Sequence, residues 1–287
     1  MSKTVISTTN NDDRGYTYSM EIPKIILFGD SITQGSFDPE KKGFGCYVTH
    51  RFARRADVVN RGFSGYTTRW AVPALPHVFV KSDRVKLVTI FFGANDSCIK
   101  ELNPRHHVPL HLYGQNIEAI INFLNNMYGD ELKIILIAPP PIDVDARLRF
   151  QIERYGKEGA TGIAQRRNPV TKLYRDIVIS IGKKYKIPVL DLFQLFLNEP
   201  NWKTFFNDGL HFSTEGNEFV GKKLLQCIDD HLHELVVKPC NFTTSFANSG
   251  SNCSGMKHLL PWHDKVVDDS FEYLNLKRQK TMERADL

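Results

Sequence analysis

Five short apolar segments recur along the chain, and stretches with helical spacing of apolar residues separate them. Their lengths suit buried β-strands, and most of them end at Gly, Pro or a polar residue. In chain order they span residues 24–29, 57–60, 84–92, 133–138 and 187–191. A strand that is apolar throughout is typical of a parallel sheet between two layers of helices. We therefore expect an α/β fold with three layers, αβα, built on a flavodoxin-like sheet of five parallel strands.

The expected helices alternate with these strands. They span residues 45–56, 67–80, 115–128, 168–186 and 214–235. Pro73 and Pro76 interrupt the pattern of the second helix, because proline lacks the N–H that a helix interior needs. Between the fourth strand and the helix that begins at residue 168, the sequence is polar and reads as an irregular insertion.

Composition divides the chain into one folded domain and two terminal segments. Residues 21–238 contain all the expected strands and helices and form the domain. Residues 1–20 are polar and predict a disordered N-terminal extension. Residues 239–287 form a C-terminal tail, in which 241–254 is rich in Asn, Ser and Thr and predicts a flexible loop. The last part, 259–287, has enough apolar content to serve as the contact of a homodimer.

The overall charge and the cysteines exclude several classes of protein. The charge balance is mild, since 37 basic and 32 acidic residues give a net charge of +5, and we expect no nucleic-acid partner. Five scattered cysteines without a CxxC pair argue against a disulfide framework and a structural zinc site. The N-terminus lacks the apolar core of a signal peptide, and no stretch approaches the roughly 18 apolar residues of a membrane span. These observations predict a cytoplasmic protein with reduced thiols.

Gly, Asn, Asp, Ser and His gather just after the predicted strands. Gly29-Asp-Ser follows the first strand, residues 62–65 follow the second, residues 93–96 follow the third, and residues 208–211 come after the fifth. In open α/β sheets, ligands bind at the carboxyl ends of the strands. The groups that acyl transfer requires, namely a nucleophile, a base, an orienting acid and oxyanion donors, are all available at this edge.

Ser31 is the candidate nucleophile, because it comes directly off the first strand and opens the next helix, where its own N–H can face a developing negative charge. His211 is the candidate base, since an imidazole titrates near neutrality. Asp208, three residues earlier, can orient the imidazole by accepting a hydrogen bond from one ring nitrogen. Taken alone, Ser31 also fits a plain helix N-cap, and Asp208 with His211 also fits a chance pair.

Gly65 and Asn95 are the candidate oxyanion donors. A glycine N–H can approach a substrate oxygen closely because no Cβ intervenes, and asparagine offers a neutral amide donor. Each also fits another role, Gly65 as a turn residue and Asn95 as a helix cap. Asp96 fits a capping group better than a catalytic one.

Three other motifs lack a feature that their usual function requires. Residues 62–66 look like a nucleophile elbow, but Tyr66 stands where the last glycine is needed. Residues 29–35 look like a phosphate loop, but no Lys-Ser/Thr follows the final glycine. His107 and His111 have the spacing of two ligands on one helix face, but Pro104 and Pro109 argue against a regular helix there. We therefore expect no metal site.

The four blocks together resemble the SGNH (GDSL-type) hydrolases. They read Gly-Asp-Ser-Ile-Thr, Gly-x-x-Gly, Gly-x-Asn-Asp and Asp-x-x-His in this order, within roughly residues 24–235. The resemblance implies that Ser31 is the nucleophile and a backbone donor, that His211 is the base and that Asp208 is its partner. It also implies that the Gly65 N–H and the Asn95 amide bind the oxyanion. Segments 61–70, 90–97, 208–213 and 262–269 resemble the isoamyl acetate-hydrolysing esterases within that family.

These residues and the resemblance predict a carboxylic ester hydrolase that uses a Ser-His-Asp triad, an acyl-enzyme and no cofactor. The resemblance implies a small-molecule substrate, namely a short-chain acyl ester such as an acetate ester. Phe63, Tyr66 and Trp70 are candidate walls of the substrate pocket. A lysophospholipase or thioesterase, an acyltransferase with the same triad, and a non-catalytic binding protein remain as alternatives.

Four arginines of the polar insertion fit a solvated face better than a site for an anionic substrate group. They are Arg147, Arg149, Arg166 and Arg167.

Overall fold

A computed structural model of the protein describes residues 22–81, 83–159 and 163–235. The predictions of a disordered extension at residues 1–20, of a flexible loop at 241–254 and of a dimer contact at 259–287 lie outside the described residues. In the part of the chain that the structure describes, no helix is both long enough and apolar enough to cross a membrane.

A five-stranded sheet forms the centre of the fold, and all its strands are parallel. The strand order is β2-β1-β3-β4-β5. The strands are β1 (Lys24–Gly29), β2 (Asp57–Gly62), β3 (Val85–Phe91), β4 (Lys133–Ala138) and β5 (Val189–Asp191). This order is that of flavodoxin-like sheets, so the predicted architecture is confirmed.

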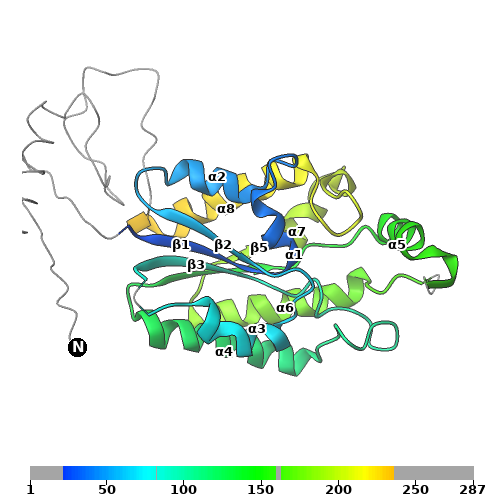
Figure 1. The fold of residues 1–287 in the computed structure, drawn as a ribbon, viewed down its shortest axis with the longest axis horizontal. Helices are drawn as coiled ribbons and strands as arrows, with labels where there is room; N and C mark the ends of the chain where they lie inside the picture. Colours follow the sequence, from blue (N-terminus) through cyan, green and yellow to red (C-terminus); the bar gives the residue numbers. More distant parts are fainter. Residues whose placement is uncertain (1–21, 82, 160–162, 236–287) are drawn as a thin grey trace, which may run out of the picture.

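Helices cover both faces of the sheet (Figure 1). On one face lie α2 (Phe44–Arg51), α7 (Leu192–Leu197) and α8 (Thr214–His231). On the other lie α3 (Thr68–Val78), α4 (Leu110–Tyr128) and α6 (Asn168–Tyr185). The helix α5 (Val144–Gly159) extends beyond the end of the sheet at which the strands finish.

The alternation of side chains along β1 explains why both layers are needed. Ile25 and Leu27 pack in the apolar cluster under α2 and α8, and Ile26 and Phe28 pack in the cluster under α3 and α4. All four side chains are at most 2% exposed. Because successive side chains of a strand point to opposite faces, a strand that is apolar throughout must be covered on both sides.

One predicted helix contains two prolines, and two helices were not predicted. The helix α3 continues through Pro73 and Pro76, which shows that burial of Ala71, Leu75 and Val78 outweighs the hydrogen bonds that the two prolines remove. The insertion after β4 contains α5, whereas its mostly polar sequence had predicted an irregular segment. The short helix α7 directly after β5 was also missed.

A close backbone approach places the end of α1 (Ser31–Gln34) beside β2. This helix begins directly after β1 and continues into the 3₁₀ turn η1 (Gly35–Phe37). A Cβ at Gly62, the last residue of β2, would lie 2.0 Å from the backbone nitrogen of Gln34. Only glycine allows the two segments to lie this close, and the contact fixes Ser31 at the carboxyl end of the sheet.

Candidate active site

The local structure around Ser31 tests whether this residue serves only as a helix N-cap. Asp30, and not Ser31, caps α1, since its Oδ1 accepts a hydrogen bond of 2.9 Å from the backbone N–H of Ile32. Ser31 is the first residue of the helix, so its backbone N–H has no partner within the helix. The Ser31 hydroxyl is therefore not used as a cap and bonds elsewhere.

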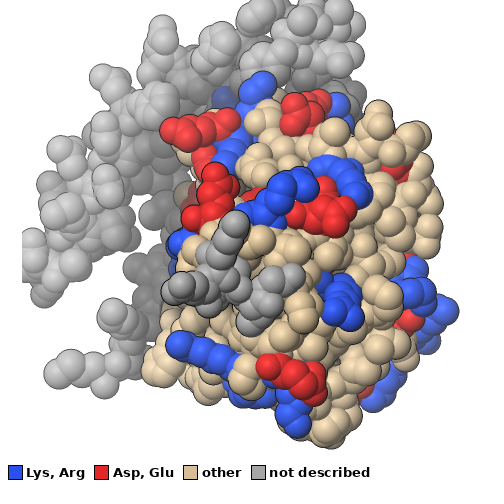
Figure 2. Space-filling view, turned by 90° about the vertical axis from the view of Figure 1, so that its right-hand side faces the viewer, with Lys and Arg blue, Asp and Glu red and all other residues tan. Residues whose placement is uncertain are grey.

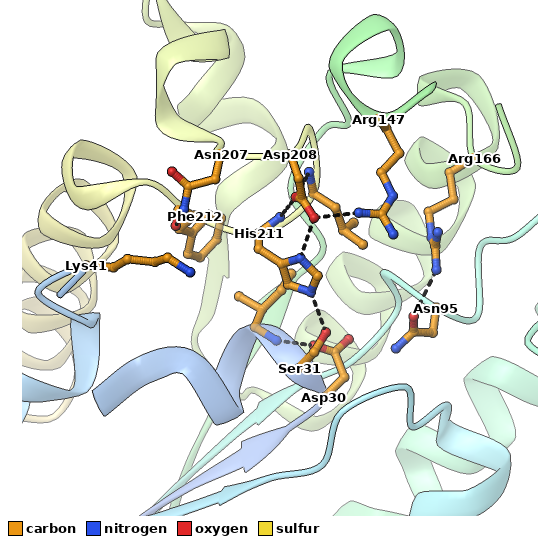
Figure 3. Close-up of polar contacts among 12 residues, drawn as sticks. Asp30, Ser31, Lys41, Asn95, Arg147, Arg166, Asn207, Asp208, His211 and Phe212 are labelled. Carbon is orange, nitrogen blue, oxygen red and sulfur yellow. Dashed lines mark hydrogen bonds and ion pairs between the residues drawn. The ribbon is translucent and has the colours of Figure 1, made fainter. Parts of the chain in front are cut away.

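The hydroxyl of Ser31 bonds to His211, and His211 bonds to Asp208 (Figure 3). Ser31 Oγ lies 2.9 Å from His211 Nε2, and His211 Nδ1 lies 2.8 Å from Asp208 Oδ2. An ionised carboxylate can only accept, so Nδ1 carries the ring hydrogen and Nε2 accepts from the serine hydroxyl. The structure thus brings together three side chains that are up to 180 residues apart in the sequence.

A tight turn holds Asp208 and His211 in this arrangement. Asp208 Oδ1 accepts hydrogen bonds from the backbone N–H groups of Leu210 at 3.0 Å and His211 at 2.8 Å. Such side-chain bonds to the following backbone are typical of Asp in turns. Gly209 has a φ of +79°, which L side chains rarely adopt. The spacing Asp-Gly-x-His therefore brings the carboxylate back to the imidazole.

The environment keeps Asp208 ionised. Burial alone would raise the pKa of this carboxyl, but the hydrogen bonds from His211, the electrostatic attraction of its ring and the positive charge of Arg147 outweigh it. The net effect holds the pKa of Asp208 well below its usual range. Arg147 contributes directly, because its Nη1 donates to Asp208 Oδ2 at 2.6 Å.

Asn95 and Gly65 also lie together. The Asn95 Nδ2 donates a hydrogen bond of 2.9 Å to the carbonyl of Tyr66, the residue after Gly65. Gly65 has a φ of +77°, so the turn between β2 and α3 favours glycine at this position. Asn95 Oδ1 accepts from Arg166 Nη2 at 2.9 Å. The predicted oxyanion residues therefore occupy one loop cluster at the strand ends.

Two of the four arginines of the insertion do not lie on a solvated face, so the prediction was wrong for them. Arg149 and Arg167 are exposed as expected. Arg147 and Arg166 are only 9% and 5% exposed, and they bond to Asp208 and Asn95. Nothing in the local sequence separates the buried pair from the exposed pair, since all four belong to the same polar insertion.

Two buried carboxyls flank the strand ends. Burial raises the pKa of Asp30 to about 6, against the hydrogen bond from Ile32, the electrostatic effect of the His211 ring and the positive charge of Arg166. Burial likewise raises the pKa of Asp96 to about 7, although the N–H and hydroxyl of Thr68 donate to its Oδ1 at 2.9 and 2.5 Å. Asp96 thus binds the first residue of α3, in agreement with the capping role expected for it.

A pocket of about 460 Å³ opens beside Ser31 and His211. It lies at the end of the molecule shown in Figure 2, where basic and acidic side chains are interspersed. Apolar and polar side chains line it together: Ser31, Ile32, Gln34, Phe37, Asp38, Lys41, Ser64, His211, Phe212 and Asn217, with Gly35.

The three aromatic residues expected to line the pocket pack against one another. The ring centroids of Phe63 and Tyr66 are 5.2 Å apart, and those of Tyr66 and Trp70 are 6.1 Å apart. The Trp70 ring in turn packs against His106, with 5.6 Å between the ring centroids. Their role as substrate walls stays a prediction.

Of the two histidines considered as metal ligands, His107 has another partner, and so does its neighbour His106. His106 Nδ1 bonds to Asn103 Oδ1 at 2.9 Å, and His107 Nδ1 bonds to the carbonyl of Cys98 at 2.8 Å. Over residues 22–81, 83–159 and 163–235, no group of three or more His, Cys, Asp or Glu side chains is placed to hold a metal ion.

Comparison with known proteins identifies the family of this chain. A model of the GDSL-like lipase/acylhydrolase family matches residues 27–219. A GDSL esterase/lipase from Arabidopsis thaliana is 44% identical over 212 residues, which cover 70% of this chain and 85% of the relative. The human isoamyl acetate-hydrolyzing esterase 1 homolog is 37% identical over 216 residues, which cover 74% of this chain and 84% of the relative.

A solved structure shows the same fold. The lipase/acylhydrolase from Enterococcus faecalis superposes with a TM-score of 0.57 at 28% identity, and the match covers 73% of this chain and 96% of that chain. The chain therefore belongs to the GDSL-like lipase/acylhydrolase family. It is a carboxylic ester hydrolase.

We expect Asp96→Asn to change how stability depends on pH. The folded-state pKa of Asp96 lies above its ordinary value of 3.8, so the contribution of this group to stability is complete below about pH 4 and is lost as the pH rises through about 7. An amide keeps an oxygen for Thr68 and cannot ionise. Relative to the unsubstituted protein, the variant's free energy of unfolding, measured by urea titration, should rise by up to about 1.4 kcal/mol per pH unit within that window.

The exposed Asp130 provides the matched control for this measurement. The difference in stability between Asp130→Asn and the unsubstituted protein should stay constant over the same pH range. A constant difference for Asp96→Asn as well would contradict the raised pKa of Asp96.

Proposed function

We propose that this enzyme hydrolyses short-chain acyl esters of simple alcohols, such as acetate esters, through an acyl-enzyme on Ser31. The observation that carries the proposal is the unbroken hydrogen-bond chain from Ser31 Oγ through the His211 ring to the Asp208 carboxylate. This chain supplies the nucleophile, the base and the orienting acid of a Ser-His-Asp triad in contact with one another.

The proposed reaction has two halves. His211 Nε2 takes the hydroxyl proton as Ser31 Oγ attacks the ester carbonyl carbon. The N–H groups of Ser31 and Gly65 and the Asn95 Nδ2 donate to the oxyanion that forms. The alcohol leaves with the proton from His211, and the acyl group stays on Ser31. Water then attacks the acyl-enzyme with His211 again as the base, which releases the acid and restores the serine.

The name of a relative favours a short acyl chain and a simple alcohol. The human relative is named for the hydrolysis of isoamyl acetate, an ester of this kind, and its match covers 84% of that protein. The pocket beside Ser31, with a volume of about 460 Å³, lies within the roughly 300–1,000 Å³ common for small-molecule sites.

We also propose a cytoplasmic location. Three of the five cysteines, Cys46, Cys98 and Cys227, are free thiols, which supports this location.

A fluorophosphonate probe tests the nucleophile directly. The probe forms a covalent bond only with a serine whose hydroxyl is activated, so it should label the unsubstituted protein at Ser31 and leave Ser31→Ala unlabelled. Ser64 lines the same pocket and lies in the motif that resembles a nucleophile elbow, so Ser64→Ala is the matched control and should label normally. Equal labelling of Ser31→Ala and Ser64→Ala, read by in-gel fluorescence, would remove the proposed role of Ser31.

A panel of p-nitrophenyl esters tests the substrate class. On the proposed short-chain specificity, kcat/KM should be highest for acetate to butanoate esters and should fall by about tenfold or more toward octanoate, because added methylenes weaken transition-state binding in a site adapted to a small acyl group. A rise in kcat/KM through octanoate and longer chains would favour a lysophospholipase or thioesterase instead. Ester formation with an added alcohol in excess of hydrolysis would favour an acyltransferase.

A further inference from the structure

Two buried arginines contact the residues of the candidate active site from outside the Ser-His-Asp triad. We propose that Arg147 and Arg166 are positioning residues for the reaction, with Arg147 acting through Asp208 and Arg166 acting through Asn95. The inference rests on the function proposed above. Both arginines come from the segment after β4, and Figure 3 shows their guanidinium groups pointing toward these two partners.

Arg166 determines which way the amide of Asn95 faces. Its Nη2 donates to Asn95 Oδ1 at 2.9 Å, and its Nε donates to the carbonyl of Ala94 at 2.6 Å. A guanidinium can only donate, so the amide oxygen must face Arg166 and the amide nitrogen must face away from it. One Nδ2 hydrogen bonds to the carbonyl of Tyr66, which leaves the other for an oxyanion. A reversed amide would present its oxygen to the oxyanion and repel it.

Arg147 completes the hydrogen bonding of the Asp208 carboxylate. Its Nη1 donates to Oδ2, the same oxygen that accepts from His211 Nδ1. Oδ1 accepts from the backbone N–H groups of Leu210 and His211. Each oxygen therefore has two donors, and the carboxylate cannot rotate without losing bonds. The positive charge of Arg147 also favours the ionised carboxylate and opposes a second positive charge on the imidazole.

The backbone around Gly209 holds Arg147 in this position. Asp143, just before α5, donates its N–H to the carbonyl of Gly209 at 3.1 Å. A Cβ at Gly209 would lie 2.3 Å from the Asp143 carbonyl oxygen and 2.5 Å from the backbone nitrogen of Arg147. The first turn of α5 thus packs directly on the turn that carries Asp208 and His211, so Arg147 is held in place by backbone contacts.

Other charged groups surround the two arginines and bear on any pH effect. Arg147 interacts electrostatically with Asp208, Arg166 and Tyr155. Asp30 interacts with His211 and with Arg166, and the buried Cys98 thiol lies in the field of both guanidinium groups. Substitution of Arg147 alone leaves Arg166, Asp30 and the other groups in place, so it changes one charge next to Asp208.

The chain offers a matched control for each arginine. Arg149 lies two residues from Arg147 on the same helix, and Arg167 is the neighbour of Arg166; both are exposed. Arg147→Met is compared with Arg149→Met, and Arg166→Met with Arg167→Met. The variant and its control therefore lose the same positive charge and the same length of side chain. The measurements are kcat and KM for p-nitrophenyl acetate as a function of pH, fluorophosphonate labelling, and the thermal unfolding midpoint.

The two substitutions should have different effects. Arg147→Met should move the acidic limb of the kcat/KM profile about one pH unit upward, because the protonated imidazole is no longer opposed by a nearby cation, and Arg147→Lys should move it back. Arg166→Met should lower kcat about 10²-fold with little change in KM. It should have no further effect on kcat in an Asn95→Ala background, because its partner is already absent. Both control variants should match the unsubstituted enzyme.

Several results would overturn the inference. An acidic limb that stays in place in Arg147→Met excludes the action through Asp208. An equal fold-loss of kcat from Arg166→Met with and without Asn95 indicates a general structural effect. If a Met variant is unfolded at the assay temperature, Arg147→Gln and Arg166→Gln, which keep a donor in the buried position, are judged by the same criteria. Missing Ser31 labelling in the unsubstituted enzyme would reject the proposed function, whereas normal labelling with variants equal to their controls rejects only the positioning roles.

Discussion

The active-site geometry depends on the hydrogen bonding of one buried carboxylate, that of Asp208. A buried charge is costly unless each of its oxygens is bonded, and here four donors satisfy it. Two of these donors belong to its own turn, one is the imidazole of His211, and one is the guanidinium of Arg147. Because the carboxylate is fixed in this way, the imidazole has one orientation, and its second nitrogen meets the hydroxyl of Ser31.

The parallel sheet brings these groups together from distant parts of the chain. The chain passes from β1 to β2 on one side and then crosses to β3 on the other side of β1. In open sheets of this kind, the ligand-binding crevice lies at this switch point, outside the carboxyl ends of the strands. Ser31 follows β1, Gly65 follows β2 and Asn95 follows β3, so three of the candidate site residues reach the crevice as a consequence of topology alone. Two close backbone approaches then set the finer geometry, that of α1 to β2 at Gly62 and that of α5 to the turn that carries Asp208 and His211 at Gly209.

Much of the site could be predicted from sequence because its signals are local. Ser31, Gly65 and Asn95 each follow an apolar strand within a few residues, and Asp208 and His211 are three residues apart. The positions of Arg147 and Arg166 could not be predicted, because their partners lie 61 and 71 residues away and a polar helix gives no sign of which arginine it buries. The residues that line the pocket beside Ser31 could be predicted only in part. Besides Ser31 and His211, they come from α1, η1 and the following loop, Ser64, Phe212 and α8, which carry no aromatic pattern of the kind that drew attention to Phe63, Tyr66 and Trp70.

The proposed mechanism requires that the acyl group pass through a covalent bond to Ser31. With p-nitrophenyl acetate, the activated leaving group makes acylation fast relative to the attack of water on the acyl-enzyme, so the intermediate should accumulate early in turnover. The most direct measurement is an acid quench during turnover of p-nitrophenyl acetate, followed by intact-mass analysis and peptide mapping. We expect the mass of one added acetyl group, located on the peptide that contains Ser31. An acetyl group on another residue, or steady hydrolysis with no covalent adduct at any time, would contradict it.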